Sequence, residues 1–416
     1  MKLSKPSQLI LVTFLGLLAA SVLTACQITT IDYVFVAGSA GTGGSSAGVI
    51  DVFAADSQSG ALRKRVSPVP SGGSMPVAMA VSPNFFNLYV ANQGSNNIVH
   101  FAIAANGQLT KKDAVTLNSE GSSPVYIAVN TAGTELYAIM AKYPGNKPGA
   151  ALAVFPLNSS GAIGSSASNG SLHYWPLVVP GFTDDLIVPT GVAVMTNNTA
   201  VFVTAYDQSA YNPGGTTTSN ANPGWVFAFH VSGSGLSAAP GSPFEAGVKP
   251  TAAVCDPTNR FVYVTDFSSN ELIGYSIRST YALDFMTNGP FKTGNEPQAI
   301  AIDQRGKYLY VANALDSSVS AYTIDLPTGT PSAAVNPTGS ATNSTDTQPI
   351  SITVDAALGR FVYTANFQGN SVSGFRLNAD TGTLTSTLSA PYPSSASPTA
   401  VISVPHGSHA TQTVTQ

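Results

Sequence analysis

The sequence predicts an all-β fold in which seven small antiparallel sheets form one closed ring. The first observation is a repeated stretch: residues 297–324 read PQAIAIDQRGKYLYVANALDSSVSAYTI, with three short apolar runs separated by turn residues. Such runs, rich in β-branched and aromatic residues and ending at Gly, Asp, Asn or Ser, are typical of strands joined by tight turns. The chain holds six such units, with starts roughly 45 to 65 residues apart. The other five units begin at Pro76, Pro124, Pro189, Pro250 and Pro349.

The second observation is a unit that is divided between the two ends of the chain. Residues 33–56 contain a second and a third run without a first, and residues 398–404 (PTAVISV) supply the missing run. Pairing these two segments would close the ring and remove its exposed sheet edges. The sequence therefore predicts a seven-bladed β-propeller over residues 33–404, in which the C-terminal strand 398–404 completes the N-terminal blade.

The composition of the runs supports this architecture. They are apolar on both faces, as expected of blades that stack face to face. The first run of each unit is also rich in small residues, such as Ala78, Ala128, Ala252 and Ala299. Blades narrow toward the ring axis, so small residues fit the innermost strand.

Residues 1–25 have the pattern of an export signal, with Lys2 and Lys5 before an apolar stretch. The segment ends Leu-Thr-Ala-Cys at Cys26, which resembles the lipobox of bacterial lipoproteins. This resemblance predicts lipidation of Cys26, a short tether over residues 26–32, and a membrane partner. By the sorting rules of double-membraned bacteria, Gln27 favours the outer membrane of the cell envelope. An ordinary signal, cleaved near Ala25 to release a soluble exported protein, is the alternative.

Composition excludes one class of partner. Only 9% of the residues are charged, the net charge is −4, and the one basic cluster is Arg63-Lys64-Arg65. Nucleic-acid binding requires a basic face, so we expect none. Cys255 is expected to be a small core residue rather than a nucleophile. Residues 405–416 read as a loose tail whose two histidines make a poor metal site, and no metal or cofactor is expected.

Loop lengths distinguish the two faces of the ring. With the strands of a blade called A to D from the axis outward, A–B and C–D turns share one face and are short. Three of the A–B turns begin with an aspartate, which an Asx-turn explains: Asp256, Asp303 and Asp355. B–C and D–A loops share the other face, and they hold nearly all of the long inserts. Function usually resides on loops mounted on a rigid scaffold, so we expect it on this insert face, although neutral loop drift is the alternative. The inserts span residues 39–48, 141–150, 207–224, 165–188 and 326–348.

The sequence contains no strong catalytic motif. Asp184 and Asp185 form the best acidic pair, and with Asp207 they are the candidates for acid–base chemistry, a solvated loop being the alternative. Asp266, Asn313 and Asn366, like Asn92, end strand B of their units. They could form a polar ring around a ligand or cap the B–C turn. Tyr206 belongs to a group of aromatic residues near the inserts that could stack on sugars or anchor a protein. The other members are Tyr143, His173, Tyr174, Trp175, Phe182, Tyr211 and Trp225, of which His173 to Trp175 could instead form an outer strand.

The repeated pattern P-x-x-[IV]-A-[IV]…G-[RK]-[FY]-[LV]-Y-V-[AT]-[ND]…S-V-S-x-[FY] resembles the lactonase-type seven-bladed propellers. This family includes bacterial 6-phosphogluconolactonases and YVTN-repeat surface proteins. The resemblance implies His and Arg just after the Pro that opens several A strands, gathered at the channel mouth to act on a lactone. In this chain the matching positions hold Tyr126, Thr190, Thr251 and Gln298, none of which replaces an imidazole or a guanidinium. We take them as ligand-contacting positions instead.

These observations favour a lipid-anchored envelope propeller that is not an enzyme and that binds a glycan, a polymer or a protein through its insert face. The alternative is a lactonase that hydrolyses a sugar lactone with groups from the inserts, namely Asp184, Asp185 or Asp207.

Overall fold

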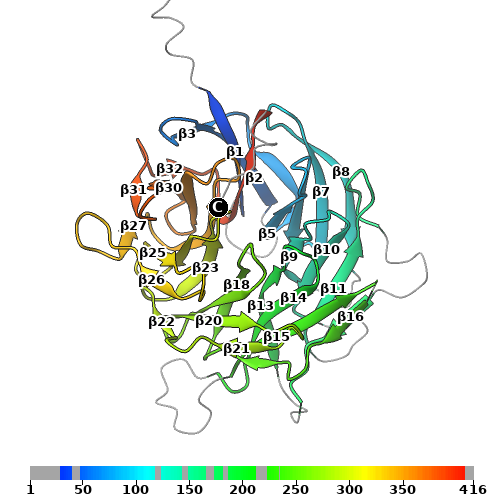
Figure 1. Ribbon diagram of the computed structural model, residues 1–416. Coiled ribbons are helices and arrows are strands. Elements are labelled where there is room, and N and C mark those ends of the chain that lie inside the picture. Colours follow the sequence, from blue (N-terminus) through cyan, green and yellow to red (C-terminus); the bar gives the residue numbers. More distant parts are fainter. Residues whose placement is uncertain are drawn as a thin grey trace, which may run out of the picture.

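The computed structural model describes residues 29–39, 47–117, 123–142, 149–164, 173–180, 186–211, 223–233 and 235–407. Within these ranges the regular structure consists of strands arranged in seven antiparallel sheets. The sheets stand around a common axis as the blades of a propeller (Figure 1). The predicted fold class is therefore confirmed.

Each blade pairs its strands in sequence order from the axis outward, except for the first blade, whose inner strand comes from the C-terminus. Blade 1 comprises β33 (Ser397–Pro405), β1 (Thr30–Ser39), β2 (Ala47–Asp56), β3 (Leu62–Lys64) and β4 (Val69–Ser74); blade 2 comprises β5 (Pro76–Val81), β6 (Asn87–Asn92), β7 (Asn97–Ile103) and β8 (Leu109–Thr116); blade 3 comprises β9 (Pro124–Val129), β10 (Glu135–Met140), β11 (Ala151–Pro156) and β12 (His173–Pro176). Blade 4 comprises β13 (Ile187–Val194), β14 (Ala200–Asp207), β15 (Gly224–Ser232), β16 (Gly235–Ala238) and β17 (Phe244–Glu245); blade 5 comprises β18 (Pro250–Cys255), β19 (Phe261–Asp266), β20 (Glu271–Ile277), β21 (Leu283–Phe285) and β22 (Phe291–Lys292). Blade 6 comprises β23 (Pro297–Ile302), β24 (Tyr308–Asn313), β25 (Ser318–Ile324), β26 (Pro331–Ala333) and β27 (Thr342–Ser344); blade 7 comprises β28 (Pro349–Val354), β29 (Phe361–Asn366), β30 (Ser371–Leu377), β31 (Leu384–Ser386) and β32 (Tyr392–Pro393).

The two ends of the chain close the ring as predicted. Strand β1 pairs with β33 in register from Asp32 opposite Pro405 to Ser39 opposite Ser397. Figure 1 shows these strands, at the blue and red ends of the colour scale, side by side. The closing strand is one residue longer at each end than the predicted segment 398–404.

The outer strand of five blades is broken into two short pieces, which the sequence reading missed. Residues 326–348 were expected to be a long D–A connection, but β26 and β27 lie there and pair with the two ends of β25. Between them the Asn336 side chain accepts hydrogen bonds from the backbone of Thr338 and Ser340, and this local turn interrupts the strand. Residues 173–176 form β12, so the outer-strand interpretation of that segment is confirmed.

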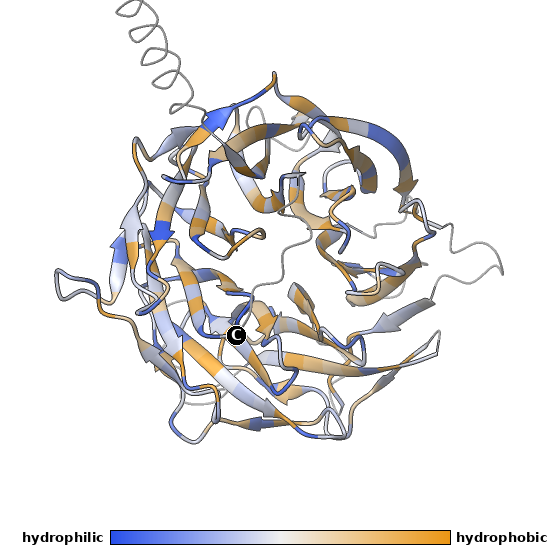
Figure 2. Ribbon diagram, turned by 45° about the horizontal axis from the view of Figure 1, so that its top comes forward, coloured by the Kyte–Doolittle hydropathy of each residue, from blue (hydrophilic) through white to orange (hydrophobic). Residues whose placement is uncertain are grey.

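The cores lie between blades, where middle strands are apolar on both faces (Figure 2). In four blades the third residue of strand B is a fully buried tyrosine whose hydroxyl donates a hydrogen bond to a glycine carbonyl in the C–D turn of the next blade. These bonds are Tyr89 to Gly161 (2.6 Å), Tyr263 to Gly329 (2.6 Å), Tyr310 to Gly382 (2.9 Å) and Tyr363 to Gly60 (2.9 Å).

The C–D turn that accepts this hydrogen bond needs a glycine for two reasons. Gly329 has a φ of 74°, in the left-handed region that disfavours side chains. A Cβ there would also lie 2.6 Å from the ring of Phe261, two residues before the donating tyrosine. Each such glycine therefore packs directly under the neighbouring blade.

The short A–B turns are held by aspartates, as the sequence predicted. Asp303 is fully buried, and its Oδ1 accepts hydrogen bonds from the amides of Lys307 (2.7 Å) and Tyr308 (2.8 Å). Asp256 and Asp355 hold the same turn in the two neighbouring blades. These carboxylates stabilise the face opposite the inserts, which we call the plain face.

A buried carboxyl lies beside the ring closure. Asp32 of β1 is fully buried, and among the described residues neither of its oxygens has a hydrogen-bond partner. Burial, and next the neighbouring Asp355 carboxylate, raise the pKa of Asp32 well above its ordinary value. Asp32 therefore holds a proton in the folded ring at a pH where the unfolded chain has released it.

We predict that Tyr310→Phe lowers the free energy of unfolding by about 1–3 kcal/mol, because the buried Gly382 carbonyl loses its partner. Urea unfolding followed by fluorescence measures this change. Tyr126→Phe is the matched control, since that hydroxyl has no hydrogen-bond partner among the described residues and its loss should leave stability nearly unchanged. Equal effects of the two substitutions would contradict the role given to the inter-blade bond.

We predict that Asp32→Asn becomes increasingly more stable than the parent chain as pH rises. Unfolding of the parent releases the Asp32 proton, so this group lowers stability progressively above the unfolded pKa of about 4. Asparagine has no proton to release. Unfolding free energies of both chains between pH 4 and pH 8 measure the effect, and a difference that does not change with pH would refute the protonated state.

Candidate functional site

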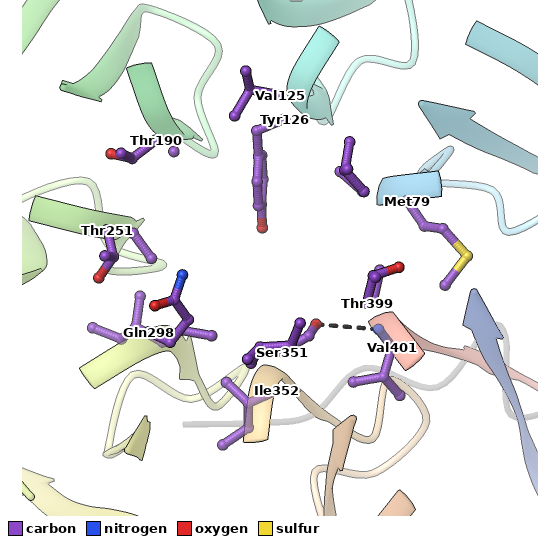
Figure 3. Close-up of a pocket in the computed structure, with 18 of the residues that line it drawn as sticks. Met79, Val125, Tyr126, Thr190, Thr251, Gln298, Ser351, Ile352, Thr399 and Val401 are labelled. Atoms are coloured by element: carbon purple, nitrogen blue, oxygen red, sulfur yellow. Dashed lines mark hydrogen bonds between the residues drawn. The ribbon is translucent and has the colours of Figure 1, made fainter. Parts of the chain in front are cut away.

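The candidate site is the mouth of the central channel, a cavity of about 370 Å³ lined by residues from all seven A strands (Figure 3). In most blades a proline pairs at the start of the A strand, and the register then shifts by one residue. A bulge of this kind re-aims a side chain. The bulged residues line the cavity: Val77, Val125, Thr190, Thr251, Gln298, Ile350 and Thr399.

Two threonines of this ring also join neighbouring blades, whereas the Thr190 hydroxyl bonds Thr204 within its own blade. The Thr251 hydroxyl donates to the Pro297 carbonyl (2.8 Å), and the Thr399 hydroxyl donates to the Pro76 carbonyl (2.6 Å). Their hydrogens are thus committed to the scaffold, and only their oxygen lone pairs remain for a ligand.

Tyr126 and Gln298 offer polar groups that the scaffold does not use. Both side chains point into the channel (Figure 3), and neither makes a hydrogen bond to another described residue. Tyr126 is enclosed by the channel walls, yet it remains 39% exposed because the lumen is hollow. Burial raises the pKa of Tyr126, so it stays a neutral hydroxyl. It is the one ionisable side chain among the residues that line the cavity.

The predicted acidic candidates do not enter this cavity where they can be placed. Asp184 and Asp185 lie outside the described residues. Asp207 is buried at the start of a B–C insert, where its Oδ1 accepts hydrogen bonds from the Ser209 amide (2.8 Å) and hydroxyl (2.6 Å). These are the contacts of a turn cap.

The residues at the ends of the B strands are fully buried and lie outside the cavity lining. Asn313 donates to the hydroxyls of Ser318 (3.0 Å) and Ser320 (2.9 Å), and Asn366 makes the equivalent bonds in blade 7. Asp266 accepts hydrogen bonds from the amides of Val248 and Lys249. The structure therefore does not bring these three residues together around the channel with Tyr126 and Gln298.

Tyr206 belongs to a cluster on the insert face, at the junction of blades 4 and 5. The Lys249 ammonium lies 5.6 Å from the ring centre of Tyr206, 5.1 Å from that of Tyr211 and 4.3 Å from that of Phe267. Lys249 makes no ion pair with a described residue. Because Lys249 precedes Thr251 by two residues, about 7 Å along the strand, the cluster adjoins the channel mouth.

Sequence reasoning missed several members of the site. Thr399 follows Pro398 just as Thr251 follows Pro250, so the repeat itself contained this signal. Ser351, whose hydroxyl accepts a hydrogen bond from the Val401 amide (3.1 Å), stands two residues after Pro349 as Tyr126 does after Pro124, so the repeat contained this signal too. Lys249 had no comparable signal.

Other candidate groups take structural places. Cys255 is buried in the core, and burial raises the pKa of its thiol far above the ordinary value. The ring centre of His406 lies 5.2 Å from that of Tyr33, so the segment after the last strand begins in contact with the propeller. His409 lies outside the described residues.

No group of three or more His, Cys, Asp or Glu suited to a metal occurs in the described part of the chain. Nor do these ranges contain a helix long and apolar enough to cross a membrane.

The fold and the site define a seven-bladed propeller with an open channel mouth at its axis. Residues 29–118 and 232–343 match the family model described as lactonase, 7-bladed β-propeller. The resemblance to the lactonase-type propeller family is therefore confirmed. None of the curated proteins compared with the chain matches it.

Solved structures show the same fold. The periplasmic gluconolactonase of Pseudomonas aeruginosa superposes with a TM-score of 0.70 at 18% identity, covering 90% of this chain and 100% of that one. A protein of Lactobacillus plantarum gives a TM-score of 0.69 at 16% identity, over 90% of this chain and 99% of that one. A protein of Bacteroides uniformis, proposed to be a 6-phosphogluconolactonase, gives 0.66 at 17% identity, over 90% and 100%. At these identities the likeness concerns the fold alone.

Proposed function

We propose that this propeller is a binding module whose channel mouth takes a small neutral polyhydroxyl ligand, such as the end of a glycan. The proposal rests on the lining of the cavity of about 370 Å³, which offers the Tyr126 hydroxyl and the Gln298 amide to a ligand. Tyr126 is also the one ionisable residue of that lining. Its size suits a small ligand. Tyr126 and Gln298 would donate to and accept from sugar hydroxyls, and the apolar side chains between them would contact the ring carbons.

Lactone hydrolysis is the alternative, suggested by the gluconolactonase of similar fold. It needs groups that stabilise the developing oxyanion and move protons. A neutral tyrosine and an amide at the mouth can position a carbonyl but provide no general base. Hydrolysis would therefore depend on residues of the inserts, including Asp184 and Asp185.

We also infer that the chain is exported and lipid-anchored through Cys26 in the outer membrane, with the membrane as its permanent partner. The periplasmic location of the Pseudomonas relative supports export. Strand β1 begins beside the end of β33, at the end of the blade that carries the A–B turns. A lipid on Cys26 would thus hold the plain face toward the bilayer and turn the insert face, with the channel mouth and the Lys249 cluster, toward the surroundings.

We predict that Gln298→Leu and Tyr126→Phe each weaken saccharide binding by about tenfold, because each removes one ligand hydrogen bond from an enclosed site. The chain from Gln27 onward, which contains every strand of the ring, is screened against neutral mono- and oligosaccharides. Binding to the best of them is then measured by calorimetry.

The control is Gln368→Leu, which removes an exposed amide from a B–C turn of the same face. Saccharide binding that responds equally to Gln368→Leu, or that ignores both channel substitutions, would place the ligand elsewhere and refute this proposal.

A further inference from the structure

A second cavity, of about 420 Å³, lies on the plain face between blades 6 and 7. Its walls include Arg305, Arg360 and Arg376, three of the seven arginines in the sequence. Arg305 comes from the A–B turn of blade 6, Arg360 comes from the A–B turn of blade 7, and Arg376 is the second-last residue of strand β30. Because all three positions belong to plain-face turns or strand ends, the cavity is distant in topology from the channel mouth.

The Arg305 side chain forms part of the wall of this cavity and is held in place by hydrogen bonds. Its Nε donates to Asp303 (2.7 Å), its guanidinium also donates to the Gly359 carbonyl (3.5 Å), and its side chain is only 13% exposed. The contact with Gly359 places it beside Arg360 across the boundary between the blades. With Asp303 it forms a neutral pair.

Arg360 and Arg376 are not compensated in this way. Neither guanidinium makes an ion pair or a hydrogen bond with another described residue, although Arg360 lies over the ring of Phe361 at 5.8 Å. No Asp or Glu lines the cavity, and Asp380, on the adjoining turn, pairs with neither arginine. The cavity thus holds two uncompensated positive charges in a chain whose net charge is −4.

Two other arginines of the plain face, Arg260 and Arg278, are engaged by the protein. Arg260 donates to the carbonyls of Leu326 (2.5 Å) and Pro327 (3.4 Å). Arg278 forms a two-bonded pair with Asp284, at 2.5 Å for each bond. The cavity between blades 6 and 7 therefore differs from the surroundings of Arg260 and Arg278 in holding guanidiniums without acceptors among the described residues.

We propose that this cavity binds a phosphate group. A phosphate oxyanion carries up to two negative charges and accepts paired hydrogen bonds from guanidinium groups, so it matches Arg360 and Arg376 in charge and geometry. The Thr385 hydroxyl, which lies opposite Arg376 in the sheet, supplies a further donor in the lining. A carboxylate would neutralise only one of the two charges.

The position of the cavity suggests where the phosphate comes from. Blade 7 adjoins blade 1 (Figure 1). Strand β1 begins opposite the end of β33, which is the plain-face end of blade 1. If the lipid anchor of the proposed function is correct, this face meets the bilayer, and the phosphate is that of a phospholipid headgroup. The site itself does not depend on the anchor, because a soluble phosphate ester has the same chemistry.

The test compares the chain from Gln27 onward with its Arg360→Gln/Arg376→Gln variant. Glycerol 3-phosphate binding is measured by calorimetry, and sedimentation with vesicles of phosphatidylcholine, with and without phosphatidylglycerol, measures binding to lipid phosphate. We expect the double substitution to weaken binding by at least about tenfold in whichever assay shows binding, since both charge-assisted contacts are lost. Binding to vesicles alone identifies the headgroup as the source, and binding of the ester identifies a soluble phosphate.

Arg278→Gln is the control for the general charge of the plain face, because it removes one cation of that face outside the cavity. An equal loss in this variant would show that binding reflects diffuse attraction, and it would overturn the proposal. Absence of binding in both assays would do the same. Circular dichroism of each variant checks that the ring is folded, and saccharide binding at the channel mouth tests the proposed function separately.

Discussion

The inter-blade bond from a strand-B tyrosine to a glycine carbonyl is the constraint on which this ring depends. It links residues 66 to 303 positions apart and repeats in four of the seven junctions. The tyrosine hydroxyl is buried, so it needs a partner, and the turn offers one only because its glycine lets the backbone approach the aromatic layer. At these four junctions the bond ties a B strand to the C–D turn of the next blade and so holds the two blades against each other.

At the ring axis, hydrogen bonding likewise distinguishes the residues that hold the ring together from those that can contact a ligand. Proline and a bulge open most inner strands, so each blade presents one re-aimed side chain to the channel mouth. Thr251 and Thr399 bond to the neighbouring blade, whereas Tyr126 and Gln298 keep their polar groups free of the described scaffold. The same fold, which the chain shares with a periplasmic gluconolactonase, here carries a channel mouth that is nearly neutral.

Much of this architecture could be predicted, because each blade corresponds to one unit of a sequence repeat. The split blade followed from one missing run, and the roles of Asp256, Asp303 and Asp355 followed from turn chemistry. The broken outer strands were missed because short, polar, edge-like segments give a weak periodic signal. At the site, Tyr126, Thr190, Thr251 and Gln298 were predicted from their place after proline. Lys249 and the three arginines were not, because residues in different turns meet only through the rotation of the blades.

The most direct test of the neutral-mouth account is the hydrolysis of δ-gluconolactone, followed by proton release at near-neutral pH. The chain from Gln27 onward is compared with buffer alone and with an Asp184→Ala/Asp185→Ala/Asp207→Ala variant. The account predicts a rate equal to the spontaneous rate, because the channel mouth lacks a general base. Acceleration that disappears in the triple variant would contradict it and would place an acid–base site in the inserts.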